Sequence, residues 1–336
     1  YRSDEEIVSG RSLVEVKAEV NLEPHFTQPV CCDPLHGSYA NASRCPSSGL
    51  RFARMNNSSL LLSSESGFQS DWKAPYHKDA QFWAANEYDT DSIMKAIAEM
   101  VGHIAQQFNL SPEMEFTVVD TMELLFVRAF KSCVQQQPGT SALPDAVDRK
   151  MDTFMRQLPI YTVAVIDIVA KYVKIGTKLD LVALKRVAKV RNGGSNMLAA
   201  EFDVIKLLDT EVHSSLLLGA VERFSMHYLL PLNVAGKETV GQIGIKLLRF
   251  TIAERALIYN SLKTSVRNPN CFRRFKTNKL ILAGAIVLGV LYLLPGAHHS
   301  KTILDQVIQP LANDCCVQES NLIYLRDAIL RAIDGR

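Results

Sequence analysis

The chain has 336 residues, 47% of them apolar, and its 37 lysines and arginines nearly balance its 35 aspartates and glutamates. This length allows two domains with a sizeable buried core. The formal net charge of +2 excludes a strong overall attraction to nucleic acid or to an anionic membrane, although a local patch could still act.

The ends and the cysteines place few constraints on the chain. The first residue is Tyr1 rather than methionine, so we expect the natural chain to be processed or to begin upstream. Residues 1–20 contain no apolar run typical of a signal peptide. The seven cysteines are scattered and no two are spaced as C-x-x-C, which fits a secreted disulfide framework poorly and indicates a reducing compartment.

Residues 1–80 differ in composition from the rest of the chain. The stretch 41–70 is rich in serine and asparagine and has no sustained apolar period. Such a segment buries too little apolar surface to offset the entropy of ordering, so residues 1–80 are predicted to form a disordered tail. A metal site in the tail is the alternative, but its spacing matches no familiar zinc pattern. The candidate ligands are His25, Cys31, Cys32, His36 and Cys45.

From Asp91 the apolar residues recur with a helical period, and five helices are predicted. Asp89 or Asp91 can cap the first, while Ser111 can cap the second with Pro112 at its first position. The third is apolar almost all the way round, which is typical of the centre of a bundle. Residues 145–157 either extend it backwards or form a separate turn. The predicted helices run from Asp91 to before Asn109, from Pro112 to Phe130, from Ile160 to Val173, from Leu179 to Val190 and from Asn196 to Thr210.

The fifth predicted helix follows a glycine-containing turn, with Ser195 as its expected cap. Its apolar side chains Leu198, Phe202, Ile205 and Leu208 are predicted to form the buried face.

Beyond His213 five more helices are predicted, again with the most apolar one in the middle, which indicates a repeated architecture. The basic run 267–279 is predicted to be a solvated loop, with nucleic-acid contact as the alternative. The five helices are expected at 216–230, 240–262, 280–294, 302–313 and 320–333.

The middle helix, Leu280–Leu294, could also be a membrane anchor. Its fifteen residues fall short of the roughly 18 expected for a span, although the basic residues before it would suit a membrane boundary. We predict a buried core helix, because it occupies the same place in its group as Ile160–Val173 does in the first.

Several short motifs occur in the order found in one family. Met94–Ile97 is similar to the Met-Arg-Ala-Ile sequence that opens the cyclin box, and Phe108–Glu113 with Thr117–Asp120 resembles the junction of its first two helices. Ile168–Lys171 resembles the Ala-Ser-Lys of the third cyclin helix, and Glu201–Leu208 resembles the Glu-x-x-Ile-Leu-x-x-Leu of the fifth. Together, the order and spacing of these motifs resemble the cyclin family.

This resemblance implies an all-α, cyclin-like fold of two five-helix units. The implied parts are the disordered tail at 1–80, a cyclin box at 90–214 and a second, degenerate unit at 215–336. Among cyclins the chain is most similar to the divergent meiotic cyclin N-terminal domain-containing proteins, which act in the nucleus and promote crossover maturation.

The function implied is a regulatory or scaffold role in meiotic recombination, through contacts with a cyclin-dependent kinase or with recombination proteins. Direct nucleic-acid and membrane contacts are not expected. No cofactor is expected, and no sequence motif for a nucleophile, a catalytic metal or a phosphate loop predicts an enzyme. The alternatives are a kinase-activating cyclin of the cell cycle or transcription, and a membrane-anchored helical protein that uses Leu280–Leu294.

Lys171 and Glu201 are the candidate partner-binding residues, because the matching lysine and glutamate of cyclins contact the kinase. Glu201 also shares the predicted buried face of Leu198 and Ile205, where a charge is costly unless it is paired, and Lys171 is the expected partner. A structural role is the alternative for both residues. Lys171 can pair with Asp167 one turn earlier, and Glu201 suits the start of its helix.

The sequence also departs from typical cyclins. Tyr172 and Val173 replace the acidic pair that often follows the helix 3 lysine, and Lys95 replaces the arginine of helix 1. The tryptophan of the substrate-docking patch is absent from the region 99–102. The resemblance therefore does not imply docking of Arg-x-Leu motifs, and kinase binding is expected to be altered or lost.

Overall fold

Helices are the regular secondary structure of the protein wherever its structure is described. The structure is a computed structural model that describes residues 72–86, 90–136, 143–173, 179–190, 196–209, 212, 214–266, 268–294 and 301–335. Every regular element in these ranges is a helix, which confirms the predicted all-α class. The candidate metal ligands of the tail, from His25 to Cys45, lie outside these ranges.

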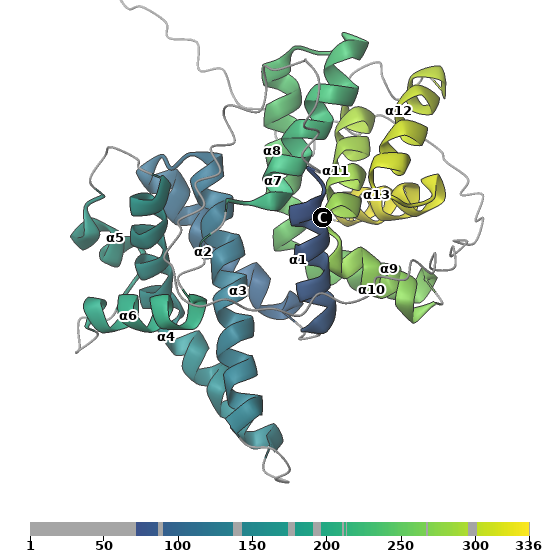
Figure 1. Cartoon of the computed structure of the whole chain (residues 1–336). Coiled ribbons are helices and arrows are strands. Elements are labelled where there is room, and N and C mark those ends of the chain that lie inside the picture. The colour runs from purple at the N-terminus through teal and green to yellow at the C-terminus, as the bar shows by residue number, and fades with distance from the viewer. Residues whose placement is uncertain are drawn as a thin grey trace, which may run out of the picture.

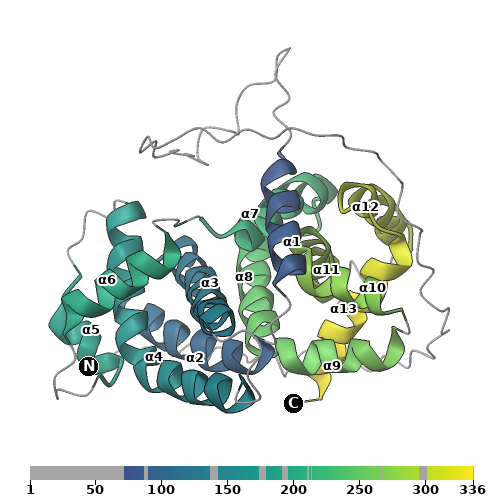
Figure 2. The same cartoon turned by 60° about the horizontal axis from the view of Figure 1, so that its bottom comes forward.

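Two groups of helices pack side by side, α2–α6 and α7–α13, with α1 at their junction (Figures 1 and 2). The first group confirms the five helices predicted between Asp91 and Thr210. It consists of α2 (Asp91–Phe108), α3 (Pro112–Gln136), α4 (Leu143–Val173), α5 (Leu181–Val187) and α6 (Met197–Leu208).

The starts of these helices follow the sequence in part. Ser111 caps α3 as predicted, since its Oγ accepts a hydrogen bond of 3.3 Å from the Met114 N–H. Asp91 does not cap α2, because the helix already includes it and Thr90 precedes it. Asn196, next to the predicted Ser195, caps α6 by accepting a hydrogen bond of 3.0 Å from the Leu198 N–H.

Helix α4 lies at the centre of the first group. It begins at Leu143, so residues 145–157 extend the predicted helix backwards and Pro159 lies inside it. Val163, Ile166 and Val169 are completely buried, as the apolar pattern predicts for a central helix.

The second group contains more helices than the five predicted. Helix α7 continues into a π-helical turn and a short 3-10 turn, η3 (Ser225–Leu229) and η4 (Leu230–Leu232). The α-helices are α7 (Leu216–Phe224), α8 (Lys237–Ala253), α9 (Arg255–Ser265), α10 (Pro269–Thr277), α11 (Lys279–Leu293), α12 (Lys301–Asp314) and α13 (Glu319–Asp334).

Two predictions for this group were wrong. The helix expected at 240–262 is broken at Glu254, whose φ of −103° departs from the helical value. The loop expected at 267–279 contains α10, which buries Phe275 and exposes Arg273 and Arg274. Its basic residues hid the helical pattern, because only one side of this short helix meets the core.

Helix α11 is the core of the second group. All twelve residues from Leu280 to Leu291 are buried among other helices, so its apolar composition has a structural reason. Gly289 permits this packing, since a Cβ atom there would lie 2.7 Å from Leu247 Cδ2. Among the described residues, Asp152–Tyr172 has the length and composition of a membrane span, and so has α10 together with α11, which are bent by 78°. Buried core helices share these properties.

Helix α1 (Ala74–Ala85) corrects the predicted tail, whose last residues belong to it. Its N-terminal end is held by an ion pair of 2.9 Å between Lys73 and Asp314 and by the edge-on contact of Trp72 with Phe224. A composition rule averages over a long window, so it missed a short aromatic segment at the tail boundary.

The structure describes the state of three of the seven cysteines. Cys315 and Cys316 are free thiols, whereas Cys271 is in a disulfide, which the cysteine spacing did not predict.

Candidate partner-binding site and the junction of the two groups

The structure brings the two predicted site residues together. Lys171 lies in the last turn of α4 and Glu201 in α6, which packs on α4. The Lys171 ammonium is 2.5 Å from Asp167 Oδ2, so the ordinary helical ion pair considered as an alternative does form. Glu201 is influenced by the Asp167 carboxyl and by the charge of Lys171. The three side chains therefore form one ionic cluster at the edge of α4 and α6.

The protonation of this cluster reflects the shared contact with Asp167. Partial burial and the hydrogen bond to Asp167 raise the pKa of Glu201, and the positive charge of Lys171 only partly opposes this. The hydrogen bond to Asp167 also raises the pKa of Lys171. Asp167 and Glu201 thus share Lys171, and Lys185 of α5 adds a smaller positive influence on Glu201.

The predicted buried face of α6 was wrong. Leu198, Phe202 and Ile205 are 73%, 67% and 43% exposed, and of the four predicted residues only Leu208 is buried. The buried stripe of α6 is instead Ala200, Val204 and Leu208.

The physical reason for this error is that α6 has two apolar stripes. Both are spaced by three or four residues, so periodicity alone cannot choose between them. The stripe with the small side chain of Ala200 packs on the neighbouring helices, and the bulkier stripe is left on the surface.

The exposed stripe changes the interpretation of Glu201. Glu201 does share a face with Leu198 and Ile205, but this face points outward, so the cost of its charge comes from partial burial near Asp167 and not from a place in the core. Tyr172 of α4 and Val182 of α5 are also large exposed apolar residues. Helices α5 and α6 lie at the end of the first group that is farthest from α7–α13 (Figure 2).

We call the partner-binding face the surface formed by the exposed residues Lys171, Tyr172, Val182, Leu198, Phe202 and Ile205 and the half-buried Glu201, with the buried Asp167 beside them. It combines bulky apolar side chains with a charged cluster. Adjacent exposed apolar side chains of this size are typical of a surface that another protein covers.

A second cluster of charges, which the sequence did not predict, lies at the junction of the two groups. Arg255 at the start of α9 donates hydrogen bonds of 2.9 Å to Asp91 and 2.5 Å to Glu123 in the first group. Its Nη2 also contacts the Thr90 hydroxyl, and Lys276 of α10 lies 2.6 Å from the other oxygen of Asp91. We call these residues the Arg255 cluster.

Protonation in the Arg255 cluster follows from burial and pairing. Burial works against the Arg255 charge, but Glu123 and Asp91 overcome it and raise the pKa of Arg255. Burial likewise opposes ionisation of Glu123, yet the charge and hydrogen bond of Arg255 hold the pKa of Glu123 below its usual value. Glu123 and Arg255 are therefore both ionised near neutral pH.

Lys279 forms a neighbouring ionic contact that holds α1 and α11 to the first group. Its ammonium lies 3.2 Å from Asp79 of α1 and 3.7 Å from Asp120 of α3. Burial opposes its charge, but these two carboxylates raise the pKa of Lys279.

The sequence contained one signal for these contacts. Asp120 and Glu123 are the charged residues within the mostly apolar stretch 116–127 of α3, and carboxylates removed from water require partners. The partners lie more than a hundred residues away, so periodicity could not identify them.

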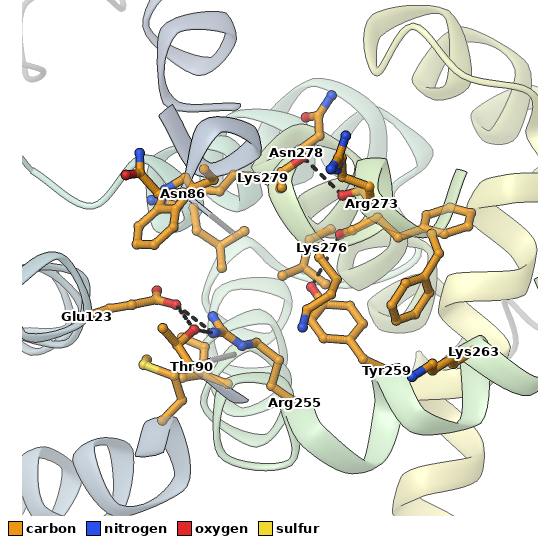
Figure 3. A pocket seen from close by; sticks show the side chains of 18 of the residues that line it. Asn86, Thr90, Glu123, Arg255, Tyr259, Lys263, Arg273, Lys276, Asn278 and Lys279 are labelled. Carbon is orange, nitrogen blue, oxygen red and sulfur yellow. Dashed lines mark hydrogen bonds and ion pairs between the residues drawn. The ribbon is translucent and has the colours of Figure 1, made fainter. Parts of the chain in front are cut away.

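A cavity of about 730 Å³ opens beside the Arg255 cluster, between α1, the start of α2, α9, α10 and the start of α11 (Figure 3). Its lining includes Glu123, Arg255, Tyr259, Lys276 and Lys279.

No model of a known protein family matches the chain, and no curated protein matches it in sequence.

Proposed function

We propose that this chain is a divergent cyclin-like protein that acts by contacts with other proteins, through its partner-binding face. The observation that carries the proposal is the exposed stripe of Leu198, Phe202 and Ile205 beside the Lys171–Glu201 pair. A surface with bulky apolar side chains beside a charged cluster suits a protein partner far better than a catalytic role.

The helix order supports the cyclin-like part of the proposal. Five helices follow one another, the third of them packs on the other four, and the motif residues Lys171 and Glu201 lie on adjoining helices. In cyclins, the matching helices contact the kinase. We therefore propose a cyclin-dependent kinase as the first candidate partner and recombination proteins as the second.

The cellular part of the proposal rests on the sequence resemblance alone. The divergent meiotic cyclin N-terminal domain-containing proteins act in crossover maturation, so we propose a nuclear role in meiotic recombination. A scaffold that holds a kinase or recombination factors at crossover sites fits a chain with a contact face and no predicted catalytic motif.

The partner-binding face is tested by changing its exposed residues. The Phe202→Glu substitution is expected to reduce kinase recovery about tenfold or more, because a central aromatic side chain typically contributes about 2 kcal/mol or more to an interface. Reversal of the charge pair, with Lys171→Glu or Glu201→Lys, is expected to weaken recovery and to reduce the activity of the bound kinase. Affinity purification followed by a kinase assay measures both effects.

The matched control is Leu257→Glu. It places the same charge on another exposed apolar residue, which lies on α9 outside the partner-binding face and is 50% exposed. It should leave recovery unchanged. All four variants are at exposed or half-buried positions, so their thermal unfolding should resemble that of the unchanged chain. Equal kinase recovery with Phe202→Glu and Leu257→Glu would exclude this face as the contact.

A further inference from the structure

Helix α6 presents a seam of three apolar side chains that the described residues leave uncovered. The seam consists of Leu198, Phe202 and Ile205, all of them exposed, which follow one another at spacings of four and three residues. This is the spacing of the d, a and d positions in the heptad repeat of a coiled coil. A helix with such a seam on its outer side can pack lengthwise against a second helix.

The rest of the described molecule leaves this seam accessible. Another side of α6 packs on α3 and α4 through the buried stripe of Ala200, Val204 and Leu208. Helices α5 and α6 also lie at the end of the first group that is farthest from α7–α13 (Figure 2). A second helix can therefore approach α6 from outside without displacing a described helix.

The charges beside the seam decide which helix fits it. In the heptad positions set by the seam, Glu201 takes a g position and Lys206 takes the following e position. Glu201 is half-buried near Asp167 and Lys171, whereas Lys206 is exposed and makes no ion pair with any residue that the structure describes. The seam thus has an acidic side chain along one edge and a cation along the other.

A second copy of this chain matches both the seam and its charges. When two such helices lie parallel and in register, each seam residue meets its own counterpart, and a g side chain meets the e side chain five residues later in the other helix. Glu201 lies five residues before Lys206, so one opposite-charge pair forms on each side of the seam. In the antiparallel orientation Glu201 would face Glu201 and Lys206 would face Lys206, so like charges disfavour it.

We infer that two copies of the chain associate through parallel α6 helices. A two-fold axis along the seam relates the copies, so the contact is self-complementary and the assembly stops at a dimer. The seam covers only about two turns of α6, which is the size of a weak, transient interface. We expect a dissociation constant between about 10 μM and about 1 mM.

The dimer covers the same exposed residues through which the proposed function binds another protein. A copy that holds a kinase on this face cannot pair with a second copy, so self-association reduces the amount of chain available to the kinase by mass action. This regulation rests on the proposed function, whereas the dimer itself depends only on the seam of α6 and its flanking charges.

Sedimentation velocity of the purified full chain, from about 1 μM to about 1 mM, measures the dimer. We expect the unchanged chain to shift from monomer to dimer across this range. Phe202→Glu should abolish the shift, because it places two like charges face to face at the centre of the seam. The control is Lys246→Glu, at an exposed position of α8 away from the seam, which should dimerise like the unchanged chain.

Exchanging the charges tests the pairing of Glu201 with Lys206. Glu201→Lys and Lys206→Glu each place like charges on both sides of the seam, so each should weaken the dimer about tenfold. A mixture of the two variants restores both opposite-charge pairs, because one copy carries two lysines and the other carries two glutamates. The mixture should therefore associate about as tightly as the unchanged chain, and circular dichroism checks that each variant is folded.

Three results would overturn the inference. They are a chain that stays monomeric at about 1 mM, a dimer that forms equally well with Phe202→Glu, and a mixture of the two charge variants that associates no more tightly than either variant alone. Sedimentation uses the chain by itself, so a kinase missing from the affinity purification would contradict the proposed function and leave the dimer standing. A chain that is always monomeric but still recovers a kinase would contradict the dimer alone.

Discussion

Arg255→Met is expected to lower the free energy of unfolding by about 3–5 kcal/mol, the usual effect of removing one partner from a buried ion pair. The substitution keeps much of the side-chain volume but leaves Glu123 without its cation at the junction of the two groups. Asp91 would keep Lys276, so the largest effect should come from Glu123. Urea unfolding followed by circular dichroism measures the change.

Arg331→Met is the matched control, because Arg331 is exposed on α13, and it should change stability by less than about 0.5 kcal/mol. Adding Glu123→Gln to Arg255→Met should restore part of the loss, since it removes the unpaired buried charge. Equal stability of the Arg255 and Arg331 variants would contradict the role given to the Arg255 cluster in joining the two groups.

Leu288→Ala is expected to lower the free energy of unfolding by about 2–5 kcal/mol, because it leaves a cavity in the core of the second group. Leu288 is fully buried in α11. Leu257→Ala makes the same chemical change at a half-exposed position and should have an effect of about 0.5 kcal/mol or less. The two variants are compared by urea unfolding under identical conditions.

The same comparison distinguishes a core helix from a membrane anchor. A helix that served only to anchor the protein in lipid would contribute little to folding of the rest of the chain. Similar small effects of Leu288→Ala and Leu257→Ala would therefore contradict the account of α11 as the central helix of its group.

Helices and their buried faces were predicted best where a helix has only one apolar face that can be buried. The long period of α2 and the all-round apolar character of α4 and α11 were sufficient to predict helices and burial. Helix α6 was harder, because Leu198, Phe202 and Ile205 form a second apolar stripe that competes with Ala200, Val204 and Leu208. Only packing on neighbouring helices selects the stripe that is buried.

Two features, the helix α10 and the break at Glu254, were not predicted because they depend on distant residues. Helix α10 is rich in arginine and lysine, and its helical face is defined mainly by Phe275, which packs in the core. The break at Glu254 places Arg255 next to Asp91 and Glu123, which lie more than a hundred residues earlier in the chain. No local pattern contains that information.

The candidate site was predicted in part. Lys171 and Glu201 lie close together in the structure, as predicted. The alternative ion pair between Lys171 and Asp167 is present as well. What the sequence did not predict is that the apolar residues around Glu201 are exposed. Because these side chains are exposed, they favour contact with another protein instead of packing within the chain.

Affinity purification of the intact chain from meiotic germ cells tests the central claim most directly. We expect a cyclin-dependent kinase or known recombination proteins to be recovered with the unchanged chain and with Leu257→Glu, and to be lost with Phe202→Glu. Recovery of neither class of protein, or equal recovery with Phe202→Glu, would contradict the claim that the α4–α6 face holds the partner.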